Sequence, residues 1–166
     1  CCSNLPSWQV VESQWLSKSM GLNRFVSCQD EYNILNRDVE AELIPAMRKY
    51  GCGLLPYFPL ASGLLTGKYK RTEMPEGARL TDMPTFANRI YLTDENFDIV
   101  DRLKKFANKT GHSILELAFG WMASRPTTAS IIAGATKPEQ IDANVAAINW
   151  VLSQSEIDEV DKISAR

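Results

Sequence analysis

Groups that could bind a small molecule follow short apolar stretches at four separate places in the sequence. Ser3 and Asn4 end one such stretch, and Gln29, Tyr57 and Gly134 end the others, each ahead of an expected helix. In parallel α/β folds, ligands bind at the carboxyl ends of the strands, where these residues would meet. One of them alone would be a structural residue, for example Asn4 as a helix cap. The four segments together favour a binding site built from amide, hydroxyl and aromatic groups.

A second feature that could bind an anion is Gly134-Ala135-Thr136, at the expected start of a helix. Glycine lets a ligand approach the backbone, and free N–H groups at a helix N-terminus attract phosphate. A capping box of Thr136 with Glu139 explains the same residues, so both interpretations stay open. The sequence contains neither a Walker motif nor a G-x-G-x-x-G loop. It therefore does not support P-loop hydrolysis or a Rossmann site.

Five cationic side chains gather in and just before a long polar segment at residues 70–92. Such a cluster could clamp a pyrophosphate or a ribose phosphate, and a solvated surface loop is the equally weighted alternative. A loop of this length in a compact domain is typically functional or mobile. The cations are Lys68, Lys70, Arg71, Arg79 and Arg89.

The histidine, cysteine and tryptophan residues fit structural roles. His112, the only histidine, lies between two expected helices with only Glu116 near it in sequence, so we expect a loop residue. The spacing of the four cysteines matches neither a zinc site nor a disulfide framework, which predicts reduced thiols and no metal. The tryptophans lie in expected helices and are predicted to pack in the core; they are Trp8, Trp15, Trp121 and Trp150.

Helices alternating with short apolar strands must position these groups. Apolar runs and turn residues predict strands at 25–29, 53–57 and 130–134, with a stub at the N-terminus. Periodicity and capping residues predict helices at 6–20, 36–50, 94–110, 114–125 and 137–148, and a last helix from Ser153. Pro45 is expected to kink the second helix. This alternation predicts a parallel sheet covered by helices.

Length and composition limit the fold and the partners. The chain has 166 residues, is 45% hydrophobic and 23% charged, and has a net charge of -2, as expected of a domain with one core. The charge balance and the absence of a ~20-residue apolar run argue against nucleic acid and membrane partners. No signal peptide is recognised, so we expect a cytoplasmic protein. A complete (β/α)8 barrel needs ~250 residues, which leaves half a barrel or a small open sheet.

Several long motifs resemble the aldo-keto reductase family. They follow the family's order along nearly the whole chain: SNL at 3–5, QDEYNILNR at 29–37, YFPLASGLLTGKY at 57–69, and IAGATKPEQ at 132–140 followed by Asn144. The resemblance implies a single partial domain over residues 1–166, the C-terminal half of a (β/α)8 TIM barrel with helices outside. It also implies an NADP(H)-dependent oxidoreductase that reduces an aldehyde or ketone by hydride transfer.

The resemblance also implies a role for each matching residue in binding NADPH. Ser3, Asn4 and Gln29 would bond the nicotinamide carboxamide, and Tyr57 would stack on the ring. The pyrophosphate channel would be lined by Pro59, Leu60, Ser62 and Lys68. The adenosine phosphate would be held by Arg79, Gly134, Thr136 and Gln140, and the adenine edge by Asn144. Amides, a flat aromatic ring and cations suit these parts of the cofactor.

Two departures from the family pattern limit what the chain can do. Ala143 stands where the family often has an acidic residue, which removes one expected adenine contact. The family's catalytic Asp, Tyr, Lys and His belong to the first half of the barrel, and no motif in these 166 residues matches them. Carbonyl reduction needs a proton donor, so we expect this chain to bind NADPH weakly and to show no turnover.

Three hypotheses follow for the protein. It could be the cofactor-binding half of an aldo-keto reductase that works on a small carbonyl substrate with a missing N-terminal half-barrel or a second copy. It could instead be a non-catalytic nucleotide-binding regulatory subunit, like the reductase-related subunits that associate with channels. The third hypothesis is a self-associating scaffold with no cofactor. We favour the first, because most of its cofactor-binding residues have a counterpart here.

Overall fold

A three-stranded parallel sheet forms the centre of the α/β fold in a computed structural model, which describes residues 1–82 and 90–165. The strands are β1 (Cys2–Ser3), β2 (Ser27–Gln29) and β3 (Gly53–Leu54), in the order β1-β2-β3. Cys2 pairs with Cys28, and Cys28 with Leu54. The predicted parallel sheet is confirmed, although β2 and β3 are shorter than the predicted strands at 25–29 and 53–57.

The predicted strand at 130–134 is wrong as a regular strand. Thr128 forms a single parallel bridge with Leu54, and the N–H of Ile132 donates to the carbonyl of Pro56 at 2.9 Å. These bonds keep the segment extended beside β3, but no bridge pairs the two described chain segments between Thr128 and Ile132. A continuous ladder therefore does not form, although the segment does lie beside β3.

Gly53 allows this segment to approach β3 closely. A Cβ atom at Gly53 would lie 2.8 Å from the Cβ of Ala129, a separation that real Cβ atoms do not adopt. The absence of a side chain at this position therefore sets the spacing between β3 and the chain that follows α6 (Ile114–Ala123).

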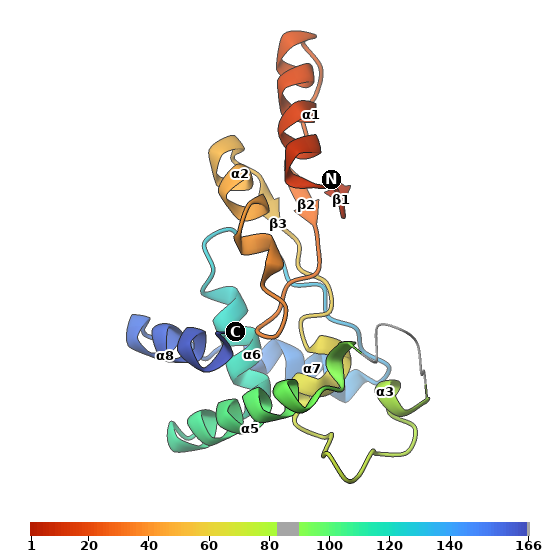
Figure 1. Cartoon of the computed structure of the whole chain (residues 1–166), viewed down its shortest axis with the longest axis vertical. Coiled ribbons are helices and arrows are strands. Elements are labelled where there is room, and N and C mark those ends of the chain that lie inside the picture. Colours follow the sequence, from red (N-terminus) through yellow and green to blue (C-terminus); the bar gives the residue numbers. More distant parts are fainter. Residues whose placement is uncertain (83–89, 166) are drawn as a thin grey trace.

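The helices are grouped in two regions. Figure 1 shows α1 (Ser7–Ser19) and α2 (Leu43–Tyr50) beside the strands. At the other end of the molecule lie α6, α5 (Asp94–Lys109) and α8 (Gln154–Ser164). Helix α7 (Pro138–Ala147) packs against α6. The chain also forms the short helix α3 (Arg79–Asp82) and the 3-10 turns η1 (Asp38–Glu40) and η2 (Ala61–Thr66).

Several helix boundaries follow the capping residues in the sequence. Thr93 caps α5 by accepting a hydrogen bond from the N–H of Asn96, and Ser113 forms a capping box with Glu116 at α6. The second predicted helix is shorter than expected, because α2 begins at Leu43. Pro45 consequently lies in the first turn, where its missing N–H breaks no helical bond, and the predicted kink is wrong.

The core between the sheet and its helices contains the buried thiols of Cys2 and Cys28, whose Sγ atoms lie 3.3 Å apart. Trp121 and Trp150 are buried as predicted. Trp8 and Trp15 are 61% and 59% exposed, so their predicted packing in the core is wrong. The opposite face of α1 carries the buried residues, and these two indoles lie seven residues apart on its outer face. None of the described helices is long and apolar enough to span a bilayer.

Candidate functional site

The carboxyl ends of the three strands bring four predicted site residues together: Ser3, Asn4, Gln29 and Tyr57, which we call the rim. The hydroxyl of Ser3 donates to the carbonyl of Gln29 at 2.7 Å, and the side-chain amide of Asn4 donates to the Ser3 hydroxyl at 3.1 Å. Tyr57 donates from its hydroxyl to Oδ1 of Asn4 at 2.8 Å. The rim therefore connects residues that are up to 53 positions apart in the sequence.

Asn4 is held in an unusual backbone conformation. Its φ angle is +55°, in the left-handed region, which asparagine tolerates better than most residues. The Asn4 backbone N–H donates to the carboxyl of the buried Asp30, which follows β2. Burial raises the pKa of Asp30, and the bond from Asn4 opposes that rise. Sequence reasoning did not select Asp30, because an acidic residue after a strand has the pattern of an ordinary surface turn.

The hydroxyl of Tyr57 remains protonated at neutral pH. Burial raises its pKa, and the negative charges of Glu31 and Asp30 raise it further. The edge of one ring meets the face of the other where Tyr57 contacts Phe58, with ring centroids 5.2 Å apart. Tyr57 is thus a fixed, neutral phenol that donates to Asn4, and it offers an aromatic surface at the rim.

The turn after Tyr57 concentrates left-handed backbone conformations. The φ angles of Phe58, Ala61 and Ser62 are +53°, +48° and +56°, and that of Gly63 is +98°. Each non-glycine residue in this region costs roughly 1 kcal/mol, and such strain gathers at functional sites. Successive backbone N–H groups in turns of this kind can form a concave anion site. Three predicted site residues, Pro59, Leu60 and Ser62, lie in this turn, and a fourth, Lys68, follows it.

Lys68 lies against this turn. A Cβ atom at Gly63 would be 3.4 Å from Cε of Lys68 and 3.6 Å from its Nζ. The ammonium group also lies 5.2 Å from the ring centroid of Tyr69. A cation therefore adjoins the left-handed turn, which suits an anionic ligand.

The structure separates the predicted cations into two groups. Lys70 pairs with Glu73 at 2.9 Å, and Arg71 pairs with Asp94 at 2.8 Å and with Asp98, so these two follow the surface-loop interpretation. Lys68 and Arg79 have no carboxylate partner within the residues described. The guanidinium of Arg79 lies 5.4 Å from the ring centroid of Phe58, next to the rim. Arg89 lies outside the described residues.

A second group of predicted residues lies at the start of α7. Gln140 accepts at Oε1 from the backbone N–H of Thr136 at 2.7 Å and from its hydroxyl at 3.2 Å. The N-cap is Lys137 with Pro138 in the first turn, so the predicted capping box of Thr136 with Glu139 is wrong. Gln140 thus accepts from the Thr136 N–H in place of Glu139. Gly134 is exposed, with open space where a side chain would lie.

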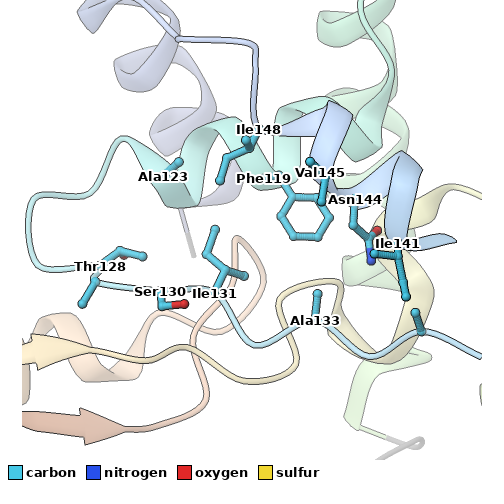
Figure 2. A pocket seen from close by; sticks show the side chains of 12 residues that line it. Phe119, Ala123, Thr128, Ser130, Ile131, Ala133, Ile141, Asn144, Val145 and Ile148 are labelled. Atoms are coloured by element: carbon cyan, nitrogen blue, oxygen red, sulfur yellow. The ribbon is translucent and has the colours of Figure 1, made fainter. Parts of the chain in front are cut away.

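Asn144 lies on α7 at a groove of about 510 Å³ between α6, α7 and the segment 128–135. Figure 2 shows Asn144 beside Phe119, Ile141 and Val145, with Ile131 on the facing segment. The bond of Ile132 to Pro56 places this segment next to the residue before Tyr57. Within the described residues, no hydrogen bond joins Asn144 or Gln140 to the rim.

The sequence model of the Aldo/keto reductase family matches residues 1–165. The chain belongs to this family. The sequence prediction of the family is therefore confirmed.

The relatives include both channel subunits and reductases. A probable voltage-gated potassium channel subunit beta from rice is 39% identical over 95% of this chain, and its Arabidopsis thaliana counterpart is 34% identical over 93%. An NADH-specific methylglyoxal reductase from Escherichia coli is 36% identical over 77% of the chain. The chain spans 48% of the length of the two channel subunits and 38% of the length of the reductase.

His112 has structural partners in this aldo/keto reductase chain. Its ring stacks on Trp150 with centroids 3.9 Å apart and an angle of 7° between the planes. Its Nδ1 lies 3.2 Å from the carboxylate of Glu116, which also closes the capping box of α6. The contacts agree with the prediction of a loop histidine that connects two helices.

Proposed function

We propose that the protein is a nicotinamide-dependent oxidoreductase that reduces an aldehyde or ketone, and that this chain supplies most of the cofactor-binding residues. The observation that carries the proposal is the bond from Tyr57 to Asn4, which joins an aromatic ring to a side-chain amide at the rim. A nicotinamide has a flat ring and a carboxamide, and these are the two groups that the rim suits.

The cofactor in this proposal is NADPH, and each part of it has matching residues. Ser3, Asn4 and Gln29 bind the carboxamide, and Tyr57 stacks on the nicotinamide. The residues that bind the adenosine phosphate and the adenine are Gly134, Thr136, Gln140, Asn144 and Arg79. The pyrophosphate binds along the turn that contains Pro59, Leu60 and Ser62, with Lys68 beside it.

The donor set fits such a ligand chemically. Lys68 and Arg79 carry positive charge that no described carboxylate neutralises, and the strained turn at residues 58–63 has left-handed residues beside Lys68. One adjustment is required at Thr136, because Gln140 already accepts its N–H. The side chain of Gln140 must therefore rotate, or a ligand must bind the Thr136 hydroxyl instead.

In this proposal the chain binds and orients the cofactor, but it does not donate the proton that the carbonyl oxygen takes up. NADPH would supply the hydride when bound, and Tyr57 and Asn4 would hold its nicotinamide ring and carboxamide. The Tyr57 proton is committed to Asn4, and burial raises its pKa, so it is a poor acid for the carbonyl oxygen. A preceding half-barrel would supply the proton donor, together with the other catalytic residues among the family's Asp, Tyr, Lys and His.

The exposed apolar surface supports a half-barrel that requires a partner. Ile141, Val145 and Ile148 on α7 are 56%, 65% and 44% exposed, beside the open edge of the segment 128–132. β1 forms the opposite edge of the sheet. An apolar helix face, and two sheet edges that pair with no further strand among the described residues, favour covering by further strands and helices, from an N-terminal half or from a second copy.

A second candidate function is a non-catalytic nucleotide-binding regulatory subunit. Its support is the similarity to channel beta subunits from three organisms, at 39%, 34% and 32% identity. The two candidates share the cofactor-binding residues and differ in turnover. Binding of NADPH by a longer form of the protein without reduction of any carbonyl compound would favour the regulatory subunit.

Fluorescence titration with NADPH tests the proposal on this chain. We expect weak binding and no aldehyde reduction. Tyr57→Phe removes the bond to Asn4 and should raise the Kd by roughly threefold, as for loss of one neutral hydrogen bond. Tyr50→Phe is the matched control, since the hydroxyl of Tyr50 has no hydrogen bond among the described residues. Absence of binding at millimolar NADPH, or equal effects of both variants, would contradict the proposal.

A further inference from the structure

A buried polar network lies directly behind the rim, and it centres on Asn33, which is fully buried. Nδ2 of Asn33 donates to the carbonyl of Phe58 at 3.0 Å and to the hydroxyl of Tyr91 at 3.3 Å. Oδ1 accepts from the N–H groups of Leu35 and Asn36, both at 2.9 Å. The side chain thus connects three segments that are distant in the sequence.

Tyr91 completes this network from the segment before α5. Its hydroxyl donates to Oε1 of Glu31, which also accepts from the side chain of Asn36 at 3.0 Å. The backbone carbonyl of Tyr91 accepts from Asn96 at 2.9 Å. Burial and the neighbouring Glu31 raise the pKa of Tyr91, so the phenol keeps its proton.

The network contacts the rim on both sides of Tyr57. Glu31 forms a parallel bridge with Tyr57, whose N–H donates to the carbonyl of Asp30 at 3.1 Å. On the other side, the bond from Asn33 holds the carbonyl of Phe58, a residue with a φ of +53°. A left-handed phenylalanine is disfavoured, so its conformation depends on neighbours that fix it.

We propose that Tyr91 is a positioning residue for Tyr57, acting through Glu31 and Asn33 to fix the backbone that carries the aromatic side of the rim. The ligand consequence rests on the proposed function: the network governs the nicotinamide end of the cofactor site and leaves the adenosine end unaffected. The chemical reason is direct, because loss of one hydroxyl leaves an acceptor on Glu31 and a donor on Asn33 without their partner in a buried site.

Hydrogen exchange tests the positioning role without any ligand. Tyr91→Phe removes one hydroxyl and keeps the ring, so the fold is retained. We expect amide exchange in the peptide covering residues 55–60 to be about tenfold faster than in the unaltered chain, the effect of losing a bond to a charged group. Tyr50→Phe is the control, and exchange in α5 reports the global stability of each variant.

A conservative variant separates positioning from general loosening. Glu31→Gln retains an Oε1 atom that can accept from Tyr91, whereas Glu31→Ala does not. We expect Glu31→Gln to keep exchange at 55–60 within about twofold of the unaltered chain, and Glu31→Ala to resemble Tyr91→Phe. Unchanged exchange at 55–60 in Tyr91→Phe, or faster exchange spread equally over α5, would overturn the proposal.

Two ligands test the consequence for the cofactor site. NADPH reaches both ends of the site, and adenosine 2′,5′-bisphosphate reaches only the adenosine end. Tyr91→Phe should weaken NADPH about tenfold and the bisphosphate less than twofold. Equal weakening of both ligands would overturn the role at the nicotinamide end. If the unaltered chain binds neither ligand while exchange at 55–60 still responds to Tyr91→Phe, the proposed function fails and the positioning role stands.

Discussion

The indole N–H of Trp121 donates to Oδ1 of Asp161 at 2.8 Å, which ties α6 to α8. The same oxygen accepts from Arg37 at 2.9 Å and from Arg125, whose guanidinium also lies 4.1 Å from the centroid of the Trp121 ring. One carboxylate oxygen therefore accepts from two arginines and from a buried indole. The last helix is held in place by this cluster as well as by its apolar residues.

Replacement of Asp161 by alanine should destabilise the chain by about 2 kcal/mol, because three buried or half-buried donors lose a charged acceptor. Urea unfolding followed by circular dichroism measures the change. Glu159→Ala is the matched control on the same helix, since Glu159 lies 4.0 Å from Lys162 at the surface. Its effect should stay below about 0.5 kcal/mol, and equal losses in the two variants would contradict the cluster's role.

Arg79 should distinguish between the two nicotinamide cofactors. Arg79→Ala removes a cation that has no described carboxylate partner, and it should weaken NADPH about tenfold while leaving NADH within twofold. The control is Arg71→Ala, because Arg71 is already paired with Asp94 and Asp98. Titration of each variant with both cofactors is the measurement. An equal loss for NADPH and NADH would remove Arg79 from recognition of the 2′-phosphate.

Asp30 should make the stability of the chain depend on pH. Burial raises its pKa in the folded state, so the folded chain binds this proton more tightly than the unfolded chain does. The free energy of unfolding therefore rises as the pH falls through the pKa of Asp30 in the folded chain. Above that pKa the folded chain bears the full cost of burying the charged carboxylate. Asp30→Asn should melt a few degrees higher at pH 7, and this advantage should narrow toward pH 4.

Thermal melts of Asp30→Asn across pH 4 to 7 check this sign. The matched variant is Asp142→Asn, because Asp142 is exposed on α7. An advantage of Asp30→Asn that widened toward acid pH would mean that the bond from Asn4 outweighs desolvation.

The close approach at Gly53 gives a prediction for packing. Gly53→Ala places a Cβ 2.8 Å from that of Ala129, and it should cost about 1–3 kcal/mol, as overpacking does. Gly134→Ala is the stability control, because nothing lies within 4 Å of a Cβ there. Urea midpoints that were equal for the two variants would show that the segment after α6 can move away from β3 at no cost.

Local sequence signals predicted most of the helices but fewer of the strands. Ser113 with Glu116 and Ser153 with Glu156 mark helix starts that the structure contains, since capping is a short-range interaction. The strand at 130–134 failed because pairing depends on neighbours distant in the sequence. The predicted burial of Trp8 and Trp15 was wrong for the same reason, because apolar residue type alone does not tell which face of α1 is covered.

The candidate site was partly predictable from the sequence. Ser3, Asn4, Gln29 and Tyr57 follow apolar strands, and the parallel sheet brings them to one edge. Asp30 and the network of Asn33 and Tyr91 were missed, because their significance depends on burial and on partners up to 60 residues away. Hydrogen bonds of that range leave no periodic pattern in a sequence.

The bond between Tyr57 and Asn4 spans from the end of β3 to the end of β1, across the strand between them. It can form only after all three strands have docked, so no fragment lacking one of them has a complete rim. Ligand affinity and folding are then thermodynamically linked, and a bound ligand would stabilise the whole assembled sheet in proportion to RT ln(1 + [L]/Kd). Melting temperature is therefore a direct readout of occupancy.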